Sequence, residues 1–176
     1  MVALDTVLEK FDASKEKVRK EIREGFFNPN GSLRISEAEL RAWIADRAVD
    51  ELKVVLQLSH VLSASAQIIP AHILVRVAEQ MSDEARHFDI LRSLVPQERQ
   101  SDIDAKAAAL PEILAADARW KALKAAVDQG NPYAALLDIN IVHEGYSAAA
   151  IEELEDIPFD DIRPDSASSG ATRVVE

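Results

Sequence analysis

Glutamate and histidine residues stand at helical spacing in the middle of this chain, where they could bind a metal ion together. Glu84 and His87 are three residues apart, in a stretch that contains neither glycine nor proline. Residues three apart share one face of a helix, so this carboxylate and this imidazole can meet the same ion. Iron and manganese suit such ligands, and zinc also fits them.

Three glutamates each occupy the centre of an apolar stripe whose members are three or four residues apart. Such steps keep side chains on one side of a helix. A carboxylate among apolar neighbours is costly unless another charge or a metal compensates it. The stripes are Leu40, Ile44, Ala48, Glu51, Val55, Leu58 and Leu62, then Ile73, Val77, Met81, Glu84, Phe88, Leu91 and Val95, and finally Leu137, Ile141, Glu144, Ala148 and Ile151.

The first two of these glutamates are predicted to lie at the same level. Glu51 is 16 residues before position 67 and Glu84 is 17 residues after it. A short turn near 66–68 would make the two helices antiparallel, and a rise of about 1.5 Å per residue then brings both carboxylates to nearly one height. Asp83 and His143 adjoin candidate ligands and could support them. The predicted ligands are Glu51, Glu84, His87 and Glu144.

Turn and capping signals divide the chain into helices and predict an all-α fold. Ser36 followed by Glu39 is typical of a capping box. Residues 1–157 are expected to form one helical domain with an N-terminal helical extension, and 158–176 an irregular or disordered tail. Helices are expected at Asp5–Phe27, Ser36–Ser65, Pro70–Val95, Pro111–Asp128 and Pro132–Glu155, with a polar linker at Gln97–Asp104.

Composition excludes several classes of function. The 31 acidic residues outnumber the 20 lysines and arginines, for a net charge of −11, so nucleic acid is not an expected partner. The absence of cysteine excludes disulfides, thiolate zinc sites and iron–sulfur clusters. No apolar run reaches the roughly 20 residues that a bilayer requires, and the N-terminus lacks a signal peptide's pattern. We therefore expect a cytoplasmic protein without a membrane partner.

The stretch from Ser82 to Phe88 resembles the Glu-x-x-His segment of the ferritin-like non-haem diiron superfamily, in its oxygenase branches. The order of one glutamate, then Glu-x-x-His, then a later glutamate is similar to that family's first three bundle helices, and the resemblance covers roughly 36–155. It implies an antiparallel helical bundle, two irons, bridging carboxylates, dioxygen activation and a ferredoxin or reductase as electron donor. It also implies that Glu51 and His87 are terminal ligands, and that Glu84 and Glu144 are bridges.

One departure from the family pattern makes the bundle incomplete. The family's fourth helix carries a second Glu-x-x-His, expected about 30 residues after Glu144, and this sequence has none there. Three explanations fit: truncation or a frameshift after Arg163, a natural remnant that binds one metal or none, or a partner chain that completes the bundle. One metal would then be held by Glu51, Glu84 and His87. The N-terminal segment or a homodimer partner would cover the apolar stripes.

Three functions follow from this reading. The first is a non-haem diiron oxygenase or oxidase that activates dioxygen to oxidise a small organic substrate. The second is an iron-binding or iron-oxidising protein of the rubrerythrin or ferritin kind. The third is a non-catalytic helical remnant that acts as an oligomeric structural protein. An elongated apolar cavity beside the metal would favour the first, and a cage-forming oligomer the second.

Overall fold

The computed structural model describes residues 4–140 and consists there of helices joined by short connections. The one β feature among these residues is an isolated bridge between Phe27 and Leu33. The prediction of an all-α chain is therefore confirmed over this range. The helices are α1 (Leu4–Phe26), α2 (Glu37–Ser65), α3 (Ala71–Ser93), α4 (Gln97–Ala116), α5 (Ala118–Asp128) and α6 (Pro132–Asp138).

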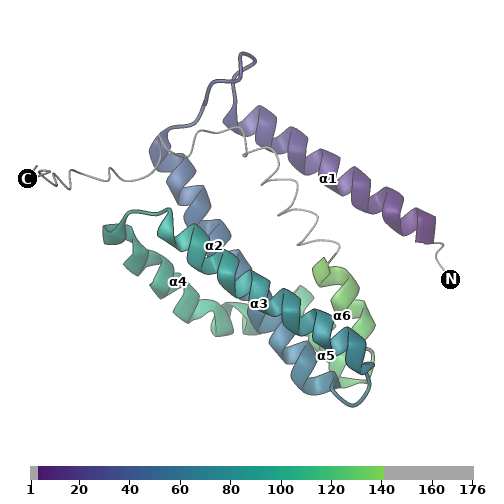
Figure 1. The fold of residues 1–176 in the computed structure, drawn as a ribbon. Coiled ribbons are helices and arrows are strands. Elements are labelled where there is room, and N and C mark those ends of the chain that lie inside the picture. The colour runs from purple at the N-terminus through teal and green to yellow at the C-terminus, as the bar shows by residue number, and fades with distance from the viewer. Residues whose placement is uncertain (1–3, 141–176) are drawn as a thin grey trace, which may run out of the picture.

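The longest helix, α2, is the centre of the arrangement (Figure 1). A tight connection at 66–70 reverses the chain, and α3 returns along α2 as its antiparallel neighbour (Figure 1). The helices α4, α5 and α6 also pack against α2, whereas α1 runs along one side, apart from this group (Figure 1). The first two stripes of the sequence analysis therefore belong to one helix pair.

The start of α2 is fixed by the predicted capping box. The hydroxyl of Ser36 accepts from the backbone N–H of Glu39, and the Glu39 carboxylate accepts from the backbone N–H of Ser36 at 2.8 Å. These contacts satisfy two backbone donors that a helix N-terminus would otherwise leave without partners. The turn before α2 contains Gly31 at a φ of 81°, a conformation that glycine adopts at little cost.

The predicted helix boundaries between α3 and α6 were wrong. Gln97–Asp104 was expected to be a linker but forms the first half of α4, and Pro111 lies inside that helix rather than at a helix start. The expected helix Pro111–Asp128 is divided at Asp117, which ends α4 and caps α5. The polar composition of residues 97–104 led to the wrong prediction of a linker. The helix α4 buries only a narrow stripe of side chains: Ile103, Leu110 and Leu114.

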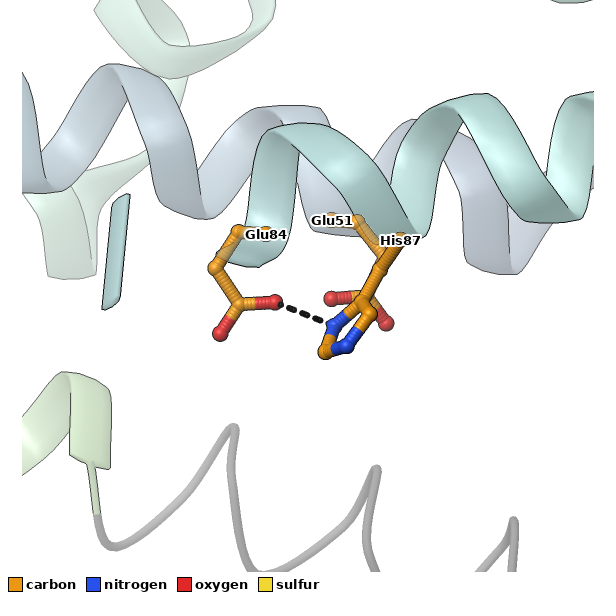
Figure 2. Close-up of side chains that lie close together, drawn as sticks. All are labelled: Glu51, Glu84 and His87. Atoms are coloured by element: carbon orange, nitrogen blue, oxygen red, sulfur yellow. Dashed lines mark hydrogen bonds and ion pairs between the residues drawn. The ribbon is translucent and has the colours of Figure 1, made fainter. Parts of the chain in front are cut away.

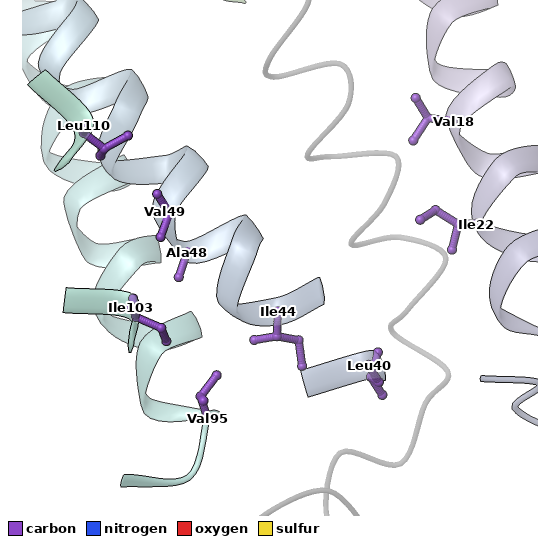
Figure 3. Packing of buried hydrophobic residues seen from close by; sticks show 9 residues of the cluster. All are labelled: Val18, Ile22, Leu40, Ile44, Ala48, Val49, Val95, Ile103 and Leu110. Carbon is purple, nitrogen blue, oxygen red and sulfur yellow. The ribbon is translucent and has the colours of Figure 1, made fainter. Parts of the chain in front are cut away.

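The buried apolar residues form two clusters, one toward each end of the α2–α3 pair. The first cluster includes Ile44 and Ala48 of α2, Val95 after α3, and Val18 and Ile22 on the side of α1 that faces α2 (Figure 3). The second cluster is built on Val54, Leu58 and Val61 of α2, with Val77, Ile69, Val127, Ala135, Leu136 and Ile139. Burial of these side chains is the main favourable contribution to the packing of the helices.

Several predictions lie outside the described residues. They concern the continuation of the last helix to Glu155, the third stripe around Glu144, the supporting role of His143, and the tail 158–176. Among the residues that the structure describes, none of the helices has the length and apolar character needed to cross a bilayer.

Candidate metal centre

The structure brings Glu51, Glu84 and His87 together. Each offers one ligand atom, and these atoms all lie within 4.8 Å of one another. Glu51 comes from α2, whereas Glu84 and His87 come from α3, and the three side chains point to the same side of the helix pair (Figure 2). The prediction that the two glutamates share one level is therefore confirmed.

This polar group lies between the two apolar clusters. Along α2, Glu51 follows Val49 of the first cluster and precedes Val54 of the second. Along α3, Glu84 lies between Val77 of the second cluster and Phe88, which packs against the first. The apolar packing is thus interrupted at one level, and it is interrupted on both helices by a carboxylate.

Both carboxylates are removed from water. Glu51 is 2% exposed and Glu84 is 3% exposed. Each has a basic partner on its own helix: Nη2 of Arg47 lies 3.1 Å from Oε1 of Glu51, and Nδ1 of His87 lies 3.2 Å from Oε2 of Glu84. Because isolated buried charges are costly, the guanidinium of Arg47 offsets part of the negative charge of Glu51, and the ring nitrogen of His87 gives Glu84 a polar partner.

The spacing of the donor atoms is close to the spacing that a metal ion requires of its ligands. Ligand bonds of about 2.1 Å place neighbouring donors about 3.0–3.4 Å apart in octahedral or tetrahedral geometry. The Glu84–His87 separation of 3.2 Å falls in this interval. The donor atom of Glu51 lies within 4.8 Å of the other two, so it would have to move closer to bind the same ion. Two carboxylates and one imidazole are suitable donors for iron or manganese, and also for zinc.

Arg47, which was not among the predicted site residues, is 8% exposed and contacts Glu51 directly. A signal was present, since Arg47 stands four residues before Glu51 and opposite charges at that spacing meet on a helix surface. The same guanidinium reaches Asp50, with Nη1 at 3.2 Å from Oδ2.

The predicted supporting residue Asp83 lies on an exposed part of α3. Its Oδ1 accepts from Nη2 of Arg86 at 2.6 Å. Its role beside the metal centre stays a prediction, and so do the roles of Glu144 and His143, which lie outside the described residues. His60, to which no role was given, lies with its Nε2 3.3 Å from Asp128 and its ring edge-on to Trp120.

Arg47, the partner of Glu51, also lines a cavity of about 370 Å³, whereas Glu51, Glu84 and His87 do not line it. Its walls come from α2, α5 and the end of α6, and they include Trp43 and Trp120. Charged side chains dominate the lining and pair with one another, as Lys53 does with Asp117 at 3.9 Å and Arg119 with Asp138 at 2.6 Å. The cavity therefore suits polar or hydrated species better than an apolar molecule.

Comparisons of the chain with protein-family models, with curated proteins and with solved structures give no match. The geometry and burial of Glu51, Glu84 and His87 are therefore the observations that bear on function.

Proposed function

We propose that this chain is a non-haem iron oxidoreductase of the ferritin-like kind, which activates dioxygen to oxidise a small organic substrate. One observation carries the proposal: two buried glutamates from antiparallel neighbouring helices meet an imidazole at one level between two apolar clusters. Burial of two carboxylates side by side lowers stability unless a cation joins them. Iron is the expected cation, and manganese or zinc can replace it.

Each side chain has a distinct part in holding the ion. Glu51 and Glu84 supply two negative charges that offset the charge of a divalent ion. His87 supplies a neutral nitrogen donor, and its side chain is 44% exposed, so it gives the ion a route from solvent. Iron held there supplies redox chemistry with dioxygen, with electrons from a separate ferredoxin or reductase.

The ferritin-like assignment is supported by the helix pair. In α2 and α3, a central glutamate on one helix faces a Glu-x-x-His segment on the next, an arrangement used by carboxylate-bridged metal proteins built in helical bundles. Glu144 is proposed as a further, bridging ligand. With it the chain would hold a second ion, and without it the chain would hold one.

Anaerobic titration with ferrous iron, followed by metal counting and exposure to oxygen, tests this function. We expect one or two irons per chain and oxygen consumption that depends on them. The variants Glu51→Gln, Glu84→Gln and His87→Ala should each lose most of the iron. Glu79→Gln is the matched control, because Glu79 is an exposed glutamate of the same helix that pairs with Arg76. Less than a tenth of an equivalent of iron, manganese and zinc in the folded wild type would leave only a structural protein.

A second candidate, iron oxidation or storage without an organic substrate, is favoured by the charged lining of the cavity beside Arg47. Such a protein would consume oxygen in a fixed ratio to added ferrous iron and would then stop. An oxygenase supplied with a reductant would continue to consume oxygen over many turnovers. Oxygen-electrode measurements with and without reductant separate the two.

A further inference from the structure

One guanidinium in the metal centre is shared between a buried carboxylate and a surface carboxylate. Arg47 donates from Nη2 to Glu51 and from Nη1 to Asp50, at 3.1 Å and 3.2 Å. The side chain of Glu51 is buried, whereas that of Asp50 is 47% exposed. Arg47 therefore bonds both a residue of the proposed ligand set and a carboxylate outside that set.

A metal ion and Arg47 both make use of the Glu51 carboxylate. Both are positive, and charges repel more strongly in a buried site than in water. Arginine stays protonated at all ordinary pH values, so it cannot lose its charge to relieve this repulsion. A divalent ion bound by Glu51 therefore weakens the attraction that holds Arg47 against this carboxylate.

A cavity beside α2 can accept the guanidinium of Arg47 when it leaves Glu51. Arg47 and Asp50 both line the cavity of about 370 Å³ beside α2, together with Lys53 and Asp117. A rotation of the Arg47 side chain toward this cavity can keep its bond to Asp50 while it leaves Glu51. Water in the cavity can then solvate the rest of the guanidinium, which limits the cost of the exchange.

We propose that Arg47 is an exchangeable counter-charge, which neutralises Glu51 in the metal-free protein and passes to Asp50 when a divalent metal binds. The inference rests on the proposed metal-binding function and adds a means by which the chain tunes that affinity. Arg47 acts here as a competitor of the metal, and Asp50 as the acceptor that lowers the cost of its release.

Titration with Mn²⁺ alone tests the exchange, with affinity read from the electron paramagnetic resonance of the free ion. Arg47→Met removes the competitor and should tighten Mn²⁺ binding about tenfold, the scale of one charge-assisted hydrogen bond. Asp50→Asn removes the alternative acceptor and should weaken binding severalfold. In the double variant the effect of Asp50→Asn should largely disappear, because the two residues act through one contact.

Two further variants are needed, one as a matched control and one as a second substitution of Arg47. Arg41→Met removes the same charge from the same helix, where Arg41 pairs with Glu37 and donates to the carbonyl of Leu94, and should leave Mn²⁺ affinity unchanged. Arg47→Gln keeps a polar side chain and serves if the methionine variant does not fold. Asp50→Asn alters a half-exposed group and is expected to fold.

The outcomes are distinguishable. Tighter binding by Arg47→Met or Arg47→Gln, with weaker binding by Asp50→Asn, supports the exchange. Weaker or unchanged binding by both Arg47 variants overturns it, because Arg47 would then hold Glu51 in position or have no influence, while the metal site itself would stand. Absence of Mn²⁺ binding by folded wild type and folded Arg47→Gln overturns the proposed function and the exchange together.

Discussion

The Glu84 carboxylate lies 3.2 Å from Nδ1 of His87, yet the two side chains have opposite surroundings. Glu84 is buried, whereas almost half of the His87 side chain is open to solvent. The three-residue step along α3 thus joins the interior of the helix pair to its surface. A metal ion bound by both would be anchored inside and reached from outside, which leads to predictions for each residue.

Glu84→Gln should stabilise the metal-free protein by about 1 kcal/mol while it removes metal binding. The substitution keeps the shape of the side chain but removes one of two neighbouring buried charges, whose desolvation is costly. Urea denaturation of the metal-free proteins measures the first effect, and the rise in melting temperature with added Mn²⁺ measures the second.

The control for this prediction is Glu79→Gln, on the exposed face of α3. Its unfolding free energy should stay within about 0.5 kcal/mol of the wild type, and its stabilisation by Mn²⁺ should be unchanged. A clear loss of stability in Glu84→Gln without metal would mean that the charge on Glu84 is already fully compensated inside the protein.

Bound metal should protect His87 from modification by diethylpyrocarbonate. The reagent attacks an unprotonated imidazole nitrogen that solvent can reach, and metal ligation occupies a ring nitrogen and restricts the ring. Peptide mass spectrometry should show slower modification of His87 with Mn²⁺ than without it. His72, exposed near the start of α3, should react at the same rate in both samples. Equal rates at His87 would argue against its role as a ligand.

Ser36→Ala should lower the unfolding free energy by about 1 kcal/mol, the usual contribution of a helix N-cap. The hydroxyl of Ser36 accepts from the N–H of Glu39, and the reciprocal contact completes the box. Ser36 is 15 residues from Glu51, or about 22 Å along the helix, so Mn²⁺ affinity should not change. Urea denaturation measures the unfolding free energy, and titration measures the Mn²⁺ affinity. A loss of affinity in a folded variant would show that the helix start positions Glu51.

Glu51, Glu84 and His87 could be predicted to lie together. Their spacing in the sequence determines which of them share a helix face and how far along its helix each one lies. Steps of three and four residues placed Glu51 and Glu84 on buried stripes, and the short connection at 66–70 fixed their relative height. The contact between Arg47 and Glu51 followed from the same spacing but was overlooked, because Arg47 does not belong to the apolar stripe. Local pattern therefore shows which charges share a face, whereas their burial depends on the neighbouring helices.

The error at α4 has a different cause. The beginning of this helix is rich in polar residues, and its order depends on partners far away in sequence. Arg92 binds Asp104 through two contacts of 2.7 Å, and Ile103 is buried in the first apolar cluster. Such long-range contacts override local composition. The break at Asp117 had a local signal, since aspartate is a favoured N-cap, but Pro111 appeared to be the stronger helix start.

Acid should remove the contribution of the Asp117 cap to stability. This carboxylate accepts from the backbone N–H groups of Trp120 and Arg119, at 3.2 Å and 2.8 Å. The bond from Trp120, reinforced by that from Arg119, holds the pKa of Asp117 below its ordinary value, although burial opposes the shift. A lowered pKa in the folded state means that the stabilisation is complete above the ordinary aspartate pKa and is lost as the pH falls through the lower folded value.

Asp117→Asn isolates this effect. Asparagine is also a good N-cap but does not titrate, so its helix start should be insensitive to acid. The wild type should exceed Asp117→Asn in unfolding free energy at about pH 7, and the difference should shrink toward about pH 3, near the ordinary carboxyl range. Asp117→Ala, which has no capping group, should lose about 1 kcal/mol at neutral pH. Urea denaturation of the three proteins at both pH values provides the measurement. A difference between wild type and Asp117→Asn that is the same at both pH values would show that the charge of Asp117 does not contribute to the cap.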